Sequence, residues 1–168
     1  MFAALIAGGT FIAIPIGPVP VVLQNLFALL AGLILGPSLG SAAVALYLFA
    51  GLLGAPVFAG FSSSITHFAG PTGGFLAGYL LMAAVAGLIA FSPTKKTSRA
   101  RIIIAAAVGL LAVYVPGLVW LKYSAGLGWG KTLAAGFFPF IPGDVLKGIA
   151  AVLVAPRLKK TVSDYLYG

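Results

Sequence analysis

The stretch IIIAAAVGLLAVYVPGLVWL, residues 102–121, runs for twenty residues without a charged side chain. A helix of about 20 apolar residues is long enough to cross the roughly 30 Å hydrocarbon core of a bilayer. This stretch therefore predicts a transmembrane helix. A kink is expected at Pro116, because proline removes a backbone hydrogen-bond donor.

Similar apolar stretches lie on both sides of it, separated by proline, glycine, serine or basic residues. The six predicted spans are residues 1–14, 22–35, 39–53, 73–91, 102–121 and 142–155. A short helix is expected at 132–138, and the Pro- and Gly-rich segments 15–21 and 54–72 are expected to interrupt the helices. We predict a single all-α domain over residues 1–168, a polytopic membrane protein whose six transmembrane helices enclose an outward-facing substrate chamber.

The composition excludes several classes of protein. The chain has 168 residues, of which 61% are hydrophobic and 7% charged, whereas soluble domains are about 45–50% apolar and about 25% charged. This difference excludes a soluble enzyme and a soluble binding module. Cysteine is absent and His67 is the single histidine, which excludes disulfides, thiolate nucleophiles and multi-histidine metal sites. Two acidic residues are too few for a dedicated calcium or magnesium site. We expect no metal, no cofactor and no catalytic residue.

The basic residues predict how the chain lies in the membrane. Lys95, Lys96, Arg99 and Arg101 lie in one loop, and Arg157, Lys159 and Lys160 follow the last span. With six spans both groups fall on one side, which the excess of Lys and Arg in cytoplasmic loops predicts to be cytoplasmic. The net charge of +8 is therefore attributed to membrane topology and contact with lipid, and no nucleic-acid partner is expected.

Asp144 and Lys147 are the residues on which the functional prediction depends. They are three positions apart in PGDVLKG, so a helix places them on one face. An ionised residue near mid-membrane costs about 2.5–3.5 kcal/mol, so such residues usually mark a functional site. The alternative is that both only reach the outer interface near the helix start. A carboxylate beside an ammonium suits a small acid or zwitterion that also carries N–H groups.

Two further groups of residues are expected near the same chamber. Gln24 and Asn25 begin the second span, where their amides either contact a ligand or are simply solvated. Thr72 and Gly73 lie at the start of the fourth span in GPTGG, where Thr72 could cap the helix and glycine permits close approach of a ligand. Turn formation alone would also explain that motif.

Two other patterns have weaker interpretations. Ala3 and Ala7 form a small-residue face on the first span, which either packs within the molecule or docks a partner helix. Ser62, Ser63, Ser64 and His67 suggest a small membrane hydrolase, but the Gly-x-Ser-x-Gly turn is absent and no third member of a triad is specified. A stand-alone proton-coupled carrier with Asp144 as the relay is a further alternative.

Four motifs occur in order along the chain: PVPVVLQ (18–24), GLLGAPVFAG (51–60), GPTGGF (70–75) and PFIPGDVLK (139–147). Together they resemble the BioY family, the biotin-specific substrate-binding (S) components of energy-coupling factor transporters. The chain departs from the family pattern at Val22, where many members have threonine, and at Phe75, where tyrosine is common. The segment from Ser62 to His67 also replaces a more glycine-rich stretch.

The resemblance implies a six-helix membrane protein that captures biotin from outside the cell. It implies partners as well, a transmembrane coupling protein and two cytoplasmic ATPases, whose ATP hydrolysis would topple the S component and release the vitamin inward. Asp144 and Lys147 match the motif residues that contribute polar groups to the biotin site, and Ala3 and Ala7 match the docking motif of the first helix. The resemblance thus implies a transport component in the bacterial cytoplasmic membrane and not an enzyme.

Overall fold

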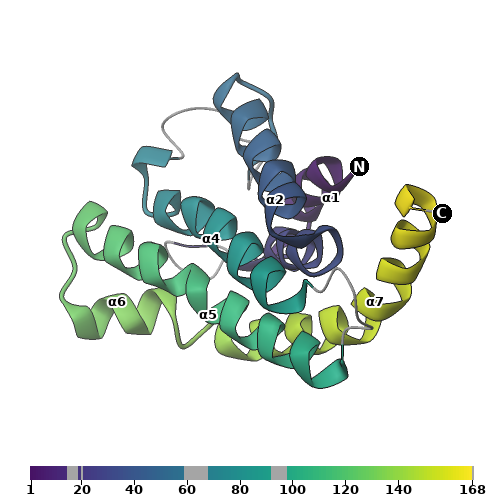
Figure 1. Cartoon of the computed structure of the whole chain (residues 1–168). Coiled ribbons are helices and arrows are strands. Elements are labelled where there is room, and N and C mark those ends of the chain that lie inside the picture. Colours follow the sequence, from purple (N-terminus) through teal and green to yellow (C-terminus); the bar gives the residue numbers. More distant parts are fainter. Residues whose placement is uncertain (15–18, 20, 59–67, 92–97, 168) are drawn as a thin grey trace.

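The protein is described by a computed structural model that covers residues 1–14, 19, 21–58, 68–91 and 98–167, without the side chains of 160 and 163–167. This part of the chain forms six α-helices, a short 3-10 helix and two short strands (Figure 1). In chain order they are α1 (Phe2–Gly8), η1 (Gly9–Phe11), β1 (Ala13–Ile14), β2 (Val21–Val22), α2 (Gln24–Leu52), α4 (Gly73–Ala90), α5 (Arg99–Ser124), α6 (Trp129–Gly136) and α7 (Ile141–Tyr167). The all-helical fold expected of this chain is confirmed.

Helix α2 contains two of the predicted spans and is broken between them. Gly36 has φ 83° and ψ −177°, a conformation that residues with a Cβ rarely adopt. Pro37 follows at once and cannot donate a hydrogen bond back into the preceding turn. The two halves therefore run in different directions, and the sequence placed the break at the same residues.

Three of the long helices meet the length and hydropathy requirement for a membrane span: α2, α4 and α5. Helix α6 and residues 141–159 of α7 form a bent pair, with an angle of 47° between them, that meets it together. The first predicted span corresponds to a shorter apolar helix, Phe2–Phe11, whose ten residues extend about 15 Å at 1.5 Å per residue. Among the described residues the structure thus contains three or four complete spans, and the other predicted spans are short or broken.

Helix α4 lies between α2 and α5 and packs closely against both (Figure 1). A Cβ placed on Gly78 would lie 2.7 Å from the carbonyl oxygen of Val113 in α5, and one placed on Gly32 of α2 would lie 2.4 Å from that of Ala83 in α4. Glycine at these positions lets the helix backbones approach, which is how helices associate where lipid removes the hydrophobic driving force. The tight packing fixes α4 and α5 beside the N-terminal half of α2.

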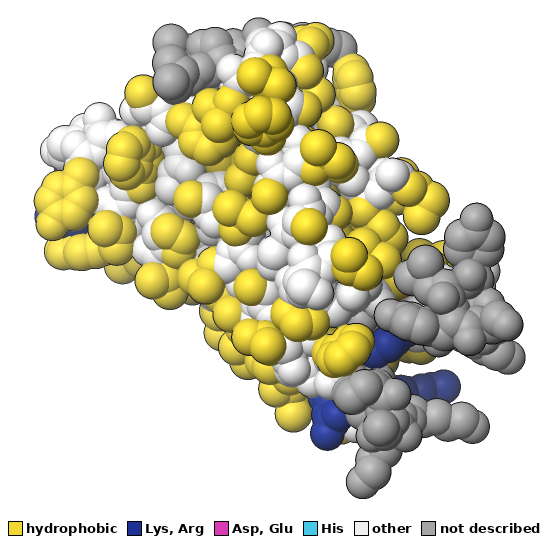
Figure 2. Space-filling model, turned by 45° about the horizontal axis from the view of Figure 1, so that its top comes forward, with side chains coloured by type: hydrophobic (Ala, Val, Ile, Leu, Met, Phe, Trp, Pro, Cys, Tyr) yellow, Lys and Arg dark blue, Asp and Glu magenta, His cyan; other side chains and the backbone are white. Residues whose placement is uncertain are grey.

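The outer surface matches a protein surrounded by lipid. Large apolar side chains are exposed on every long helix, including Leu46, Leu88, Leu111 and Leu153. Figure 2 shows one face covered by hydrophobic side chains, with most of the visible Lys and Arg side chains at one end. Such a surface would aggregate in water but is the expected surface of a polytopic membrane protein.

The pair of strands was not predicted from the sequence. β1 and β2 pair antiparallel, with Ala13 opposite Val22 and Ile14 opposite Val21. Three prolines within residues 15–20 argued for an irregular loop, and that segment is described only at Val19. The pairing matters for function because it holds Val22 next to the start of α2, where Gln24 and Asn25 lie.

Candidate binding site

Asp144 and Lys147 lie in the first two turns of α7 and are both buried, with 7% and 6% of their surfaces exposed. The Lys147 ammonium lies 3.3 Å from Oδ1 of Asp144, so the pair on one helix face that the spacing predicted is present. Asp144 also lies in the first turn of α7, near the positive end of the helix dipole. The interpretation of these residues as solvated groups at a helix end does not fit their burial.

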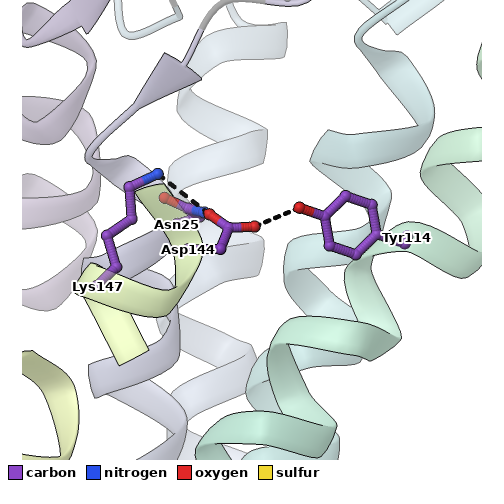
Figure 3. A network of polar contacts seen from close by, with 4 residues as sticks. All are labelled: Asn25, Tyr114, Asp144 and Lys147. Atoms are coloured by element: carbon purple, nitrogen blue, oxygen red, sulfur yellow. Dashed lines mark hydrogen bonds and ion pairs between the residues drawn. The ribbon is translucent and has the colours of Figure 1, made fainter. Parts of the chain in front are cut away.

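Two other helices supply hydrogen bonds to the same carboxylate (Figure 3). Asn25, at the start of α2, donates from Nδ2 to Oδ1 of Asp144 at 2.9 Å. Tyr114, in the middle of α5, donates from its hydroxyl to Oδ2 at 2.5 Å. Asn25, Tyr114, Asp144 and Lys147 therefore form one buried polar cluster, which we call the Asp144 cluster.

Tyr114 was not identified from the sequence. It lies inside the stretch that predicted a transmembrane helix, and a single phenol in an apolar span is usually a packing residue. The available signal was its hydroxyl, a hydrogen-bonding group that needs a partner when it is buried at membrane depth. Only the packing of α5 against α7 identifies Asp144 as that partner.

Gln24 belongs to a second polar group next to the cluster. Its side chain is buried, and its Oε1 accepts a hydrogen bond from the hydroxyl of Tyr47 at 3.3 Å. The hydroxyl of Tyr79 also interacts with the Gln24 amide. Gln24 thus connects the two halves of α2 with α4.

A small cavity opens beside the Asp144 cluster and has a volume of about 30 Å³. It is lined by side chains from β2, α2, α4, α5 and α7 and from the residues just before β2 and α7: Val19, Val22, Asn25, Phe75, Tyr79, Val113, Tyr114, Phe140, Asp144 and Lys147. One wall is therefore polar and the others are aromatic or aliphatic. This combination is typical of a site for a small ligand with a polar end and an apolar body.

Thr72 and Gly73 do not line this cavity. Thr72 precedes α4 but its side chain makes no capping hydrogen bond, and a Cβ on Gly73 would lie 1.9 Å from the carbonyl oxygen of Phe68. Gly73 thus permits a close backbone contact within the turn. The side chains through which α4 reaches the cavity are Phe75 and Tyr79, one and two turns further along.

The cluster has unused hydrogen-bonding capacity beside the cavity. Oδ1 of Asn25 is buried without a hydrogen-bond partner, and Asn25 is one of the residues that line the space. An unsatisfied buried acceptor costs about 1–3 kcal/mol. The Lys147 ammonium has three N–H groups, of which one is directed at Asp144. The site therefore offers acceptors and donors side by side to a ligand that carries both.

A larger groove lies on the other side of Asp144, between α5 and α7, with a volume of about 610 Å³. Apart from Tyr114 and Asp144, its lining residues are apolar or glycine, and several, such as Leu111 and Leu153, are more than half exposed. The groove thus opens on the outer surface of the helix bundle. Asn25 and Lys147 line only the inner cavity. We assign the binding site to the inner cavity for this reason.

The remaining predicted residues lie elsewhere. Ala3 and Ala7 are half-buried on α1 and pack in part against the hydrophobic core. The segment from Ser62 to His67 lies outside the described residues. No group of three or more His, Cys, Asp or Glu side chains that could hold a metal ion occurs in the described part of the chain.

Known proteins resemble this chain over most of its length. The model of the BioY family matches residues 1–164. A probable biotin transporter BioY of Pyrococcus horikoshii is 41% identical over 95% of this chain and 92% of its own length. The biotin transporter BioY of Thermotoga maritima is likewise 41% identical, with the same coverage of both chains.

A solved structure shows the same fold. The crystal structure of the S component for biotin from an ECF-type ABC transporter matches with a TM-score of 0.86 and 33% identity, covering 95% of this chain and 87% of that one. The family match extends over nearly the whole chain, including the helices that build the Asp144 cluster. The chain therefore belongs to the BioY family.

Proposed function

We propose that this protein is the biotin-binding S component of a vitamin uptake transporter. The observation that carries the proposal is the Asp144 cluster, a buried acid and amine with one orphaned acceptor, next to a cavity with aromatic walls. A buried ion pair contributes little to stability compared with apolar residues of the same size. Its presence here, in a chain of the BioY family, supports a role in recognition.

The hydrogen-bonding groups of biotin complement those of this site. Its ureido ring carries two N–H donors, which suit the Asp144 carboxylate and the orphaned Oδ1 of Asn25. The ureido oxygen is an acceptor and suits the Lys147 ammonium, which has further N–H groups, whereas the Tyr114 hydroxyl donates its one proton to Asp144. The apolar thiophane ring would lie against the aromatic walls formed by Phe75 and Phe140.

Binding must also widen the cavity. Its volume of about 30 Å³ leaves room for only a few water molecules, while sites for small molecules are about 300–1,000 Å³. Val19, Val22 and Phe140 lie outside the long helices or at their ends and line the cavity. We propose that this roof moves outward to admit biotin and then closes over it.

We further propose that transport depends on partners. The protein would form a single six-helix domain in the bacterial cytoplasmic membrane, with its chamber facing outward and with the C-terminus and the 92–101 loop cytoplasmic. A transmembrane coupling protein and two cytoplasmic ATPases would supply the energy, with Ala3 and Ala7 on the docking face of α1. The family membership and the basic residues at one end of the molecule support this arrangement.

Isothermal titration of the purified protein with biotin tests the proposal. We expect saturable binding, and weaker binding of an analogue whose ureido nitrogens are methylated, because methylation removes the donors that Asp144 and Asn25 would accept. Absence of saturable heat with biotin would overturn the proposal. Equal affinity for biotin and the methylated analogue would exclude the Asp144 cluster as the site of recognition.

A further inference from the structure

Binding of biotin does not explain the groove between α5 and α7. It runs along the two antiparallel helices from Ile103 and Leu153 at one end to Tyr114 and Asp144 at the other. Ile103 and Tyr114 are eleven residues apart in α5, which is a distance of about 16 Å along the helix axis. This distance is about half of the roughly 30 Å hydrocarbon core. The groove is thus about as long as one leaflet is thick, and it ends beside Tyr114 and Asp144.

The lining of the groove indicates what can fill it. Apart from Tyr114 and Asp144, its lining residues are apolar or glycine, and its volume is about 610 Å³. Extended hydrocarbon chains suit this length and this apolar lining.

The end of the groove at Ile103 and Leu153 is basic. Arg99 and Arg101 lie in the first turn of α5, Arg157 follows the groove-lining part of α7, and all three side chains are exposed. The positive charges of Arg101 and Lys159 are close enough to repel one another. The chain has only two acidic side chains, and Asp144 is paired with Lys147, so this end, which we call the basic end, carries a large excess of positive charge.

We propose that the groove binds one anionic phospholipid, with its acyl chains along α5 and α7 and its phosphate on Arg99 and Arg157 at the basic end. These two arginines lie one helical turn beyond the groove-lining residues Ile103 and Leu153. Charge complementarity selects this occupant, since each arginine near the bilayer surface attracts anionic headgroups. A second copy of the chain in the same orientation would bring another basic end to the same level, where like charges repel. The bound acyl chains would cover Tyr114 and Asp144 on the side that faces lipid.

Native mass spectrometry of the full chain, equilibrated in detergent with equal amounts of dioleoyl phosphatidylglycerol and dioleoyl phosphatidylcholine, tests this proposal. We expect one phosphatidylglycerol to be retained in preference to phosphatidylcholine. The double variant Arg99→Gln, Arg157→Gln should retain phosphatidylglycerol about thirtyfold more weakly, at about 1 kcal/mol per arginine. The matched double variant Lys122→Gln, Lys131→Gln, which removes two charges from the opposite end, should retain it as the wild type does.

A second pair of variants tests the groove itself. Ala107→Phe fills the groove, whereas Val108→Phe adds the same ring to an exposed neighbour that does not line it. We expect only Ala107→Phe to reduce retention of the lipid. Equal retention of the two lipids, or equal retention by the arginine and lysine variants, would overturn the proposal, as would an unaffected Ala107→Phe protein. Lipid-independent dimers cross-linked through a single cysteine at Leu111→Cys would also overturn it, because they would identify a second copy as the occupant.

Discussion

At the scale of single residues, Asp144 receives contacts from three different helices. Asn25 of α2, Tyr114 of α5 and Lys147 of α7 all direct a donor at its carboxylate. The sequence predicted the acid, the amine and the amide, because ionisable and amide groups are conspicuous in apolar spans. It did not predict Tyr114, because which of the six tyrosines meets the carboxylate depends on how α5 packs on α7.

Asp144→Asn should weaken biotin binding by about 2–5 kcal/mol, since it leaves the Lys147 ammonium buried without its partner. Titration calorimetry measures the change directly. Asp164→Asn is the matched control, because Asp164 is the only other acid in the chain and lies about five and a half turns further along α7. Unchanged affinity in the Asp144 variant would remove this carboxylate from the site.

Tyr114→Phe should weaken biotin binding by about 1.5–3 kcal/mol, the contribution of a hydrogen bond to a charged group. The ring that packs against Phe137 and Phe75 is kept, so the packing changes little. Tyr123→Phe removes the same hydroxyl from an exposed ring and should have no effect on affinity. An equal response of the two variants would mean that the Tyr114 hydroxyl does not position Asp144.

At the scale of elements, close helix contacts hold the cluster together. α4 fits between α2 and α5 because glycines face backbone carbonyls at Gly32 and Gly78. The apolar spans and the break at Gly36 could be predicted, because hydropathy and a Gly-Pro pair are local signals. The β1–β2 pairing could not, since three prolines argue against strands and the pairing joins residues on either side of them.

Gly78→Ala should destabilise the protein by about 1–3 kcal/mol, the usual effect of overpacking, because its Cβ would lie 2.7 Å from the Val113 carbonyl oxygen. Thermal unfolding in detergent, followed by circular dichroism, measures the shift. Gly130→Ala in α6 is the matched control, since nothing lies within 4 Å of the added methyl group. A Gly78→Ala protein as stable as the wild type would contradict the close packing of α4 on α5.

At the scale of the whole molecule, the polar cluster lies deep in an apolar body and is sealed by short segments at one end. β2 and the start of α7 meet there, with Val21 Cγ1 3.7 Å from the place of a Cβ on Gly143. The sequence predicted that the chamber lies beside these segments. It gave no measure of how nearly the side chains close the cavity, because that depends on the packing of all five contributing elements.

The double variant Val21→Cys, Gly143→Cys should lock this closure, because the native chain has no cysteine and the geometry is close to that of a disulfide. The oxidised protein should bind biotin much more slowly than the same protein after reduction, as stopped-flow tryptophan fluorescence would show. The reduced form is its own control. Equal rates in both forms would show that the ligand enters by another path.

The central claim is that biotin is recognised by the Asp144 cluster inside the helix bundle. A crystal structure of the protein with biotin bound tests it most directly. We predict that the ureido nitrogens lie within hydrogen-bond distance of the Asp144 carboxylate and Oδ1 of Asn25, with the roof residues displaced. Biotin in the groove between α5 and α7, or bound with its ureido ring away from Asp144, would contradict the account.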